Sequence, residues 1–258
     1  MKIDIISKNE DLIAFVHILF HAGHDVRAVN RIGPCDILVY DFEFKKDIPK
    51  IDGIKIENYN DPNQQVEEDF SISFVNKDVS YKINDCCTLM GKGRVRDELK
   101  CDMSVNNPDP DLMELVTKFI RLKNRFKIFS KQPIYTFNYC GTIPENNTGD
   151  LYASSKVNIV LDKYSLYRIL ESGGTPLTNI KDSNLPEEMV FDSQEDFEQK
   201  AEYLINNEAK DISEIRNDTI KKYNPFVEWA NIFNKLGLKK SAQKCKSTIN
   251  ARTKDLYF

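Results

Sequence analysis

The sequence predicts an α/β protein made of two successive lobes, each with a parallel sheet and crossover helices. Short β-rich segments alternate with helical segments along most of the 258 residues, which is typical of parallel sheets. The composition, 41% hydrophobic and 29% charged, is that of an ordinary globular protein. A chain of this length can bury a core in each of two lobes.

The first lobe is expected over residues 1–98. Its helix, predicted at Glu10–Ala22, is followed by Gly23, which fits the left-handed residue that ends a helix. Its strands are predicted at Lys2–Ser7, Asp25–Val29, Cys35–Tyr40, Ile54–Tyr59 and Phe70–Val75. This lobe is compact, and we place the connection to the next one within Asn84–Lys100, where the pattern weakens.

The second lobe is expected over residues 99–236. Asp109 as N-cap and Pro110 at the first helical position begin a helix, and Ser193 and Asp196 have capping-box spacing. Strands are predicted at Cys101–Val105, Phe126–Phe129, Ile134–Tyr139, Val157–Leu161 and Thr175–Ile180, with helices at Gly149–Ser155 and Leu166–Ser172. Both lobes are therefore expected to be Rossmann-like.

The sequence gives no sign of a membrane span or a targeting segment. The longest apolar stretch, Leu12–Phe20, is broken by His17 and is far shorter than the roughly 20 residues that a spanning helix needs. The N-terminus, MKIDIIS, lacks the apolar core of a signal peptide. We expect a cytoplasmic protein.

Cysteine and histidine spacing does not favour a metal site. The six cysteines form no CxxC pair, so free thiols are expected. His17 and His21 are four residues apart on one predicted helix, a spacing that can bind a metal. We interpret them as structural residues before the second strand, and we expect no bound metal.

The most informative segment is LYASSKVNIVLDKYSLYRILESGGTPLTN, from Leu151 to Asn179. Arg168 and Glu171, three residues apart on one helix face, precede the small-residue turn Ser172-Gly173-Gly174 and then Thr175-Pro176-Leu177. The segment resembles the nucleotide-sugar-binding segment of GT-B glycosyltransferases, and in particular the spore-maturation-type glycosyltransferase family and the phage DNA β-glucosyltransferases. The match extends from Gly141 to Leu236. The alternative is an ordinary ion pair before a helix-stop turn.

The resemblance implies a fold and a donor site. GT-B proteins have two Rossmann-like lobes whose parallel sheets face a central cleft, and residues 237–258 would form a basic tail that packs back on the first lobe. Arg168 would meet the diphosphate and Glu171 the ribose hydroxyls, while Ser172, Gly173 and Gly174 would let the backbone approach the nucleotide. The donor would be a nucleoside diphosphate sugar, which we expect to be UDP-linked, and no metal cofactor would be needed.

One donor-site position departs from the family pattern. Many retaining GT-B enzymes carry a second glutamate seven residues before the ribose-binding one, and here that residue is Tyr164. Tyr164 remains a donor-site candidate, but the choice between inversion and retention stays open.

An inverting transferase needs a carboxylate or histidine to take the proton from the acceptor hydroxyl, and we expect the first lobe to provide it. Asp61 follows the strand at Ile54–Tyr59, and its position resembles that of the catalytic aspartate in the phage enzymes. Asp41 and Glu43, just after the preceding strand, are alternatives. The alternative is that Asp61 is simply a turn residue before Pro62.

Cations in two regions suggest contacts to acceptor phosphates. Lys92, Arg94 and Arg96 lie in the predicted connection, and Lys235–Phe258 carries seven Lys or Arg residues against one Asp. They fit a nucleic-acid backbone, or simply a solvated surface. The net charge of −4 argues against DNA.

The leading hypothesis is a glycosyltransferase, hexosyl or pentosyl, acting on an unidentified acceptor hydroxyl. A narrower hypothesis is a phage or other viral enzyme that glycosylates hydroxymethylated bases, which requires base flipping. A third is a non-catalytic nucleotide-binding or interaction protein that retains the fold.

Overall fold

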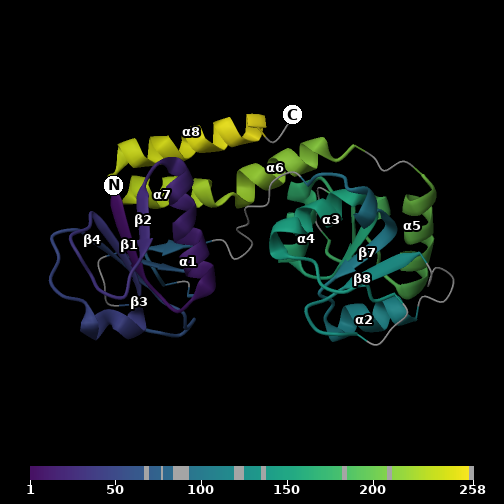
Figure 1. Ribbon diagram of the computed structural model, residues 1–258, viewed down its shortest axis with the longest axis horizontal. Coiled ribbons are helices and arrows are strands. Elements are labelled where there is room, and N and C mark those ends of the chain that lie inside the picture. Colours follow the sequence, from purple (N-terminus) through teal and green to yellow (C-terminus); the bar gives the residue numbers. More distant parts are fainter. Residues whose placement is uncertain are drawn as a thin grey trace. The chain divides into compact units, whose positions relative to one another are not determined.

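The computed structural model describes residues 1–66, 70–76, 78–83, 93–118, 125–134, 138–181, 185–207 and 211–255. The chain divides into two compact units: Met1–Cys87 with Tyr223–Phe258 (unit 1), and Thr88–Lys222 (unit 2). Each contains one parallel sheet (Figure 1). Lys92, one of the expected phosphate contacts, lies outside the described residues.

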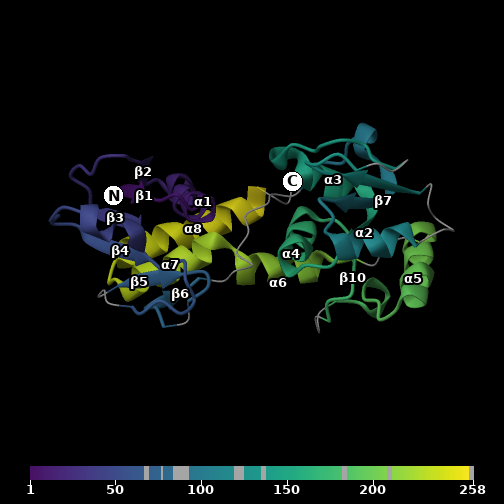
Figure 2. The same ribbon diagram turned by 90° about the horizontal axis from the view of Figure 1, so that it is seen from below.

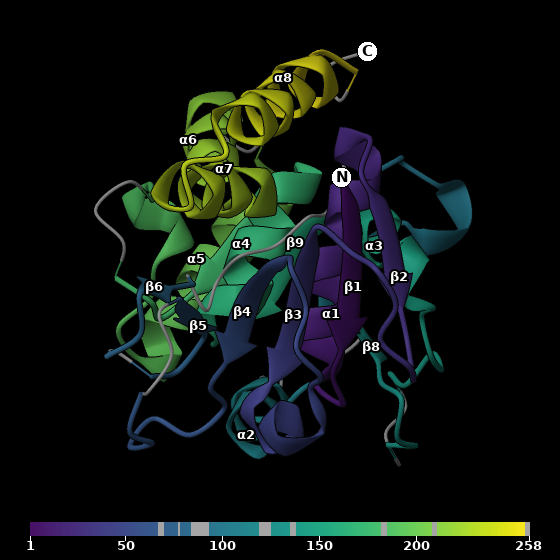
Figure 3. The ribbon, with the colours of Figure 1, turned by 90° about the vertical axis from the view of Figure 1, so that its left-hand side faces the viewer.

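The sheet of unit 1 has the strand order β2-β1-β3-β4-β5-β6. Its strands are β1 (Lys2–Ile6), β2 (Asp25–Ala28), β3 (Ile37–Asp41), β4 (Ile54–Asn58), β5 (Ser71–Ser73) and β6 (Tyr81–Lys82). The arrows of β1, β3 and β4 point to the same edge (Figure 3). Since β2 and β3 lie on opposite sides of β1, the strand order reverses between β1 and β3.

The first helix of unit 1 begins and ends as its sequence predicts. Asn9 caps α1 (Glu10–His17), accepting hydrogen bonds from the amides of Asp11 and Leu12. A 3₁₀ turn, η1 (Ile18–Ala22), continues it to Gly23, whose φ of 75° is the left-handed conformation expected of that glycine. A second 3₁₀ segment, η2 (Phe42–Asp47), follows β3.

The last two helices, α7 (Pro225–Lys235) and α8 (Lys239–Asp255), belong to unit 1 and pack against each other (Figures 1 and 2). The Trp229 ring stacks on Phe15 with centroids 4.9 Å apart, and its Nε1 donates to the Phe15 carbonyl at 2.7 Å. The expected division grouped residues 223–236 with the second lobe and 88–98 with the first. The α7 segment groups with unit 1 because its apolar face is buried in that core. The described residues 93–98 group with unit 2, where the Gly93 and Arg94 amides donate to Ser172 and Asp150.

The sheet of unit 2 has the order β10-β9-β7-β8. Its strands are β7 (Cys101–Asn106), β8 (Phe126–Phe129), β9 (Ser155–Val160) and β10 (Pro176–Thr178). Its helices are α2 (Pro110–Thr117), α3 (Thr148–Ser154), α4 (Lys163–Ser172), α5 (Gln194–Asn206) and α6 (Ser213–Tyr223). Since β8 and β9 lie on opposite sides of β7, the order reverses between β7 and β9.

Both predicted helix caps of unit 2 are present. The Asp109 carboxylate accepts from the Leu112 amide at 2.7 Å, and Ser193 Oγ accepts from the Asp196 amide at 3.2 Å. The strand predicted at Ile134–Tyr139 falls partly outside the described residues, and its described part contributes only a bridge between Tyr139 and Ile128. Within the described ranges, no helix is both long and apolar enough to cross a bilayer.

Candidate functional site

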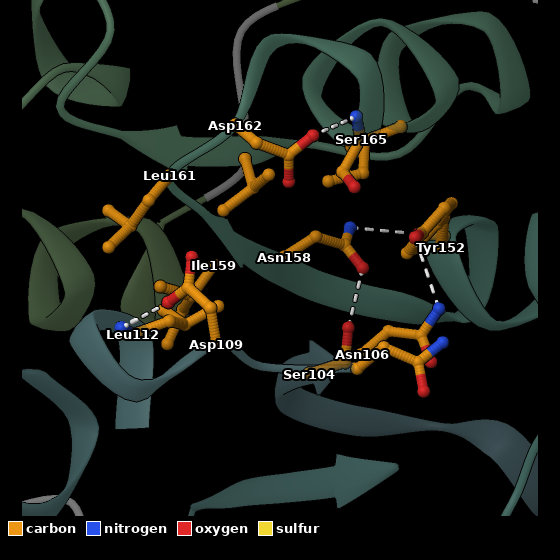
Figure 4. Close-up of a pocket in the computed structure, with 13 residues that line it drawn as sticks. Ser104, Asn106, Asp109, Leu112, Tyr152, Asn158, Ile159, Leu161, Asp162 and Ser165 are labelled. Atoms are coloured by element: carbon orange, nitrogen blue, oxygen red, sulfur yellow. Dashed lines mark hydrogen bonds between the residues drawn. The ribbon is translucent and has the colours of Figure 1, made fainter. Parts of the chain in front are cut away.

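A small polar pocket lies at the carboxyl ends of β7 and β9, where the strand order of unit 2 reverses (Figure 4). Ligands of open parallel sheets bind at such positions. The cavity measures about 30 Å³, room for about two water molecules. Its lining includes Ser104, Asn106, Asn107, Asp109, Tyr152, Asn158, Asp162 and Ser165. The pocket therefore suits one small polar group.

Asn158 fixes the floor of this pocket. Its Oδ1 accepts from Ser104 Oγ at 2.6 Å, and its Nδ2 donates to the Tyr152 carbonyl at 3.0 Å (Figure 4). The same Nδ2 donates to the Thr175 carbonyl at 3.2 Å. Asn158 is 1% exposed, so these bonds satisfy polar groups that water cannot reach. The amide ties β7, β9 and the segment before β10 together.

Two asparagines at the end of β7, Asn106 and Asn107, shape the opposite wall. Asn106 Nδ2 donates to the Tyr152 hydroxyl at 3.2 Å, and burial raises the pKa of that phenol. Asn107 has a φ of 46°, a left-handed conformation that asparagine tolerates better than most residues. Its Oδ1 accepts from the Lys131 amide at 3.0 Å.

The charges at the pocket are carboxylates. Asp109 caps α2, and Asp162 caps α4 by accepting from the Ser165 amide at 2.8 Å. These caps already engage helix amides that would otherwise attract an anion, and none of the described residues lining the pocket is Lys or Arg. Carboxylates beside amides and hydroxyls suit a sugar-like hydroxyl better than a phosphate.

The predicted donor residues Arg168 and Tyr164 lie together on α4, outside the lining of this pocket. The Arg168 guanidinium is 5.3 Å from the centre of the Tyr164 ring and forms an ion pair with Glu145. Its side chain is 13% exposed, whereas Tyr164 is 45% exposed. The structure thus brings a cation and an accessible aromatic ring together.

The other two predicted side chains on α4 are buried inside unit 2. Glu171 is 2% exposed, and its carbonyl accepts from Arg216 Nε at 2.7 Å. Ser172 is fully buried, and its Oγ donates to the Ile169 carbonyl at 2.8 Å. The structure therefore separates Glu171 and Ser172 from the exposed Tyr164.

Both predicted glycines have structural reasons to be glycine. Gly173 has a φ of 85° and ends α4, as the helix-stop alternative requires. A Cβ on Gly174 would lie 2.6 Å from the Tyr152 carbonyl oxygen and 2.9 Å from Asn158 Nδ2. Gly174 thus permits the close packing behind the pocket.

The described part of the cationic connection is fastened to α3 and α4. The Gly93 amide donates to the Ser172 carbonyl at 2.9 Å, and the Arg94 amide donates to Asp150 at 2.7 Å. Arg96 Nε lies 2.6 Å from the same Asp150 carboxylate. Arg96 therefore has a structural partner, while the Arg94 side chain is exposed.

A polar network lies at the carboxyl edge of unit 1. Asp41 is 1% exposed and accepts from Ser7 Oγ at 2.6 Å, Asn58 Nδ2 at 2.8 Å and the Lys8 amide at 3.1 Å. Its oxygens are thus engaged in joining β1, β3 and β4. Glu43, the second alternative base, forms an exposed ion pair with Lys8 at 3.3 Å.

Asp61, the leading candidate base, is exposed and follows β4. Its Oδ1 accepts from the Asn63 amide at 2.9 Å, and its carbonyl accepts from Asn76 Nδ2 at 3.0 Å. The turn that the sequence suggested is therefore present. Of the three candidate bases, Asp41 is the one whose carboxylate is buried in a network.

Pattern analysis of the sequence missed Ser104, Asn106, Tyr152 and Asn158. Ser104 lies between Met103 and Val105, and Asn158 lies between Val157 and Ile159. A polar residue between two apolar neighbours in a strand is a signal that could have been used. No group of three or more His, Cys, Asp or Glu among the described residues is placed to hold a metal ion.

Comparisons with known proteins give the fold. No protein-family model and no curated protein sequence matches the chain. Among solved structures, it is similar to spinosyn forosaminyltransferase SpnP, with a TM-score of 0.51 and 10% identity over 92% of this chain and 99% of that one. An α1,3-fucosyltransferase with GDP gives a TM-score of 0.45 at 10% identity, covering 97% and 90%. The chain has the α/β fold of GT-B glycosyltransferases, with two parallel sheets.

Proposed function

We propose that this protein is a glycosyltransferase that moves a sugar from a nucleoside diphosphate sugar to an acceptor hydroxyl. The observation that carries the proposal is the fold shared with a forosaminyltransferase over 92% of the chain. The polar pocket at the edge of unit 2 supports it, because its carboxylates and amides suit hydroxyl groups. UDP is the nucleotide that we expect in the donor.

Arg168 and Tyr164 are the proposed contacts to the nucleoside diphosphate part of the donor. A guanidinium binds phosphate oxygens in a planar fork, and the ring can stack on a base or ribose. Glu145 currently pairs with Arg168, and its side chain is 62% exposed. A diphosphate would replace this carboxylate, so donor binding exchanges one anionic partner for another.

Asp61 is the proposed base. As the acceptor oxygen attacks the anomeric carbon, its proton passes to the Asp61 carboxylate, and the bond from that carbon to the diphosphate breaks. The nucleoside diphosphate leaves with the electron pair of that bond. The ion pair between Arg96 and Asp150 gives no support to a nucleic-acid acceptor.

Nucleotide binding tests the donor site. Calorimetric titration with UDP, GDP and dTDP, and with their sugar conjugates, should identify one nucleotide that binds at micromolar Kd. Arg168→Ala should weaken it about tenfold, equivalent to about 1.4 kcal/mol. Arg125→Ala is the matched control, because Arg125 also pairs with a carboxylate, that of Asp102, at the amino edge of the same sheet.

Sugar transfer and donor hydrolysis test the base. Asp61→Asn should abolish both while nucleotide affinity is retained. Asp52→Asn is the control, since Asp52 is exposed just before β4 whereas Asp61 follows the same strand. Failure of every nucleotide to bind would overturn the proposal and favour a non-catalytic interaction protein.

A further inference from the structure

A second hollow lies at the carboxyl edge of unit 1. Its volume is about 760 Å³, within the roughly 300–1,000 Å³ of small-molecule sites. Segments that follow three strands form it: Ser7–Lys8 after β1, Val29–Ile32 after β2, and Phe44 with Asp47–Pro49 after β3. It borders the point between β1 and β3 where the strand order reverses, the position at which parallel sheets bind ligands.

The walls of this hollow are mainly apolar. Six half-buried apolar side chains line it: Ile6, Ile13, Val29, Ile32, Phe44 and Ile48. Each leaves apolar surface in contact with water, and covering such surface contributes about 25 cal/mol per Å². The walls therefore favour a ligand with an apolar body over a nucleotide, whose base and sugar carry many polar atoms.

Two cationic side chains line the hollow, Lys8 and Arg31, and they differ in whether they have an ionic partner. Lys8 is in an ion pair with Glu43 at 3.3 Å, and its Nζ lies 5.2 Å from the centre of the Phe44 ring. Arg31 is exposed and has no ion pair or hydrogen bond within the part of the chain that the structure describes. A guanidinium fork of this kind matches a carboxylate, sulfonate or phosphate.

We propose that this hollow binds a small amphipathic anion, with its apolar body against the isoleucine walls and its anionic group on Arg31. Asp47 also lines the hollow, so a single anionic group at the Arg31 side is favoured over several spread around the ligand. The proposal concerns unit 1 alone and does not depend on sugar transfer.

Two fluorescent probes of similar body test the two halves of the proposal. 8-Anilinonaphthalene-1-sulfonate (ANS) is an apolar body with one sulfonate, and N-phenyl-1-naphthylamine lacks the sulfonate. Both should bind the wild-type chain, ANS more tightly. Arg31→Gln should weaken ANS about tenfold and change the affinity for the neutral probe less than twofold. Arg94→Gln, which removes an exposed arginine from unit 2, should leave both affinities unchanged.

Ile32→Glu tests the walls by placing a carboxylate in the hollow, and both probes should then be lost. A partly unfolded variant would not imitate this result, because such states bind more ANS rather than less, and far-UV circular dichroism detects complete unfolding. The proposal is overturned if Arg31→Gln binds ANS like the wild type, or if Ile32→Glu keeps both probes. It is also overturned if a second copy covers the hollow, which would appear as a dimer that Ile32→Glu converts to monomer.

Discussion

The carboxyl edges of the two sheets share one strand pattern and differ in chemistry. The first four strands of the unit 1 sheet, β2-β1-β3-β4, have the same order as the four strands of unit 2, β8-β7-β9-β10, so each unit has a reversal point beside its first strand. At that point unit 1 carries a hollow of about 760 Å³ lined mainly by apolar side chains. Unit 2 carries a polar pocket of about 30 Å³.

This difference shows which part of a site the topology supplies and which part the side chains decide. The reversal of strand order separates the loops on either side and leaves a space in both units. Isoleucines and Arg31 line the hollow of unit 1, whereas amides and capping carboxylates line the pocket of unit 2. The same fold can therefore present two unrelated ligand chemistries.

The largest expected difference between the units appears in mild acid. All three histidines are in unit 1, and His24 is buried with neither ring nitrogen hydrogen-bonded within the described residues. Burial, together with the charges of the N-terminus and Lys244, lowers its pKa from 6.5 to about 4. The unfolded chain therefore takes up a proton near pH 6.5 that the folded chain resists until about pH 4.

Stability should accordingly be lost as the pH falls from 6.5 toward 4, by about 3 kcal/mol at roughly 1.4 kcal/mol per pKa unit. Urea unfolding followed by Trp229, the single tryptophan and part of unit 1, measures it. His24→Leu should remove most of this slope, whereas His17→Gln, on the exposed side of α1, should keep it. Equal slopes in both variants would contradict the assignment.

The next largest effect tests the packing behind the pocket of unit 2. Gly174→Ala would press a methyl group against the Tyr152 carbonyl, 2.6 Å away, and should destabilise the chain by about 2 kcal/mol. In Gly173→Ala the new methyl group would meet no atom within 4 Å. Only the backbone strain of an alanine at a φ of 85° remains, which costs about 1 kcal/mol. Urea unfolding followed by circular dichroism ranks the two. The reverse ranking would mean that the backbone gives way at Gly174.

Sequence periodicity predicted much of the fold because local chemistry fixes it. The β8 strand occurs at its predicted residues, and Gly23, Asp109 and Ser193 end or begin helices as expected. These signals depend on a few neighbouring residues. The placement of α7 depends instead on Phe15 packing against Trp229, a contact across more than two hundred residues, which no local pattern reveals.

The candidate site was less predictable, for a related reason. The sequence shows that Arg168 and Glu171 are three residues apart on α4. It does not show whether each side chain is buried, because that depends on what packs against the helix. Glu171 is buried and Arg168 pairs with Glu145 from a distant segment. Ser104 and Asn158 meet only because β7 and β9 are neighbours. Sheet order, which periodicity does not give, therefore decides the pocket.

The hydrogen bonds of two buried asparagines allow the two edges to be compared directly. Asn158→Leu would remove the acceptor of Ser104 Oγ and the Nδ2 donor to the Tyr152 carbonyl in unit 2, which should cost about 1.5 kcal/mol. The Thr175 carbonyl would keep its bond from the backbone amide of residue 158. Asn58→Leu would remove a donor from the Asp41 carboxylate in unit 1, and bonds to charged groups are worth about 1.5–3 kcal/mol. Urea unfolding should show both losses, with the loss in unit 1 at least as large. A neutral Asn158→Leu would indicate that water replaces the amide.

The smallest expected effect is that of Lys8→Gln, which tests whether anion binding at the hollow of unit 1 depends on Arg31 itself or on the total positive charge. The side chains of Lys8 and Glu43 are 74% and 52% exposed, and exposed ion pairs contribute little, so Lys8→Gln should change stability by less than about 0.5 kcal/mol. Because Glu43 already balances the charge of Lys8, Lys8→Gln should weaken ANS binding less than twofold. Arg31→Gln should weaken it about tenfold. Fluorescence titration of both variants at two salt concentrations makes the comparison. If Lys8→Gln weakens ANS as much as Arg31→Gln does, the anion responds to summed positive charge, and the specific role of Arg31 is wrong.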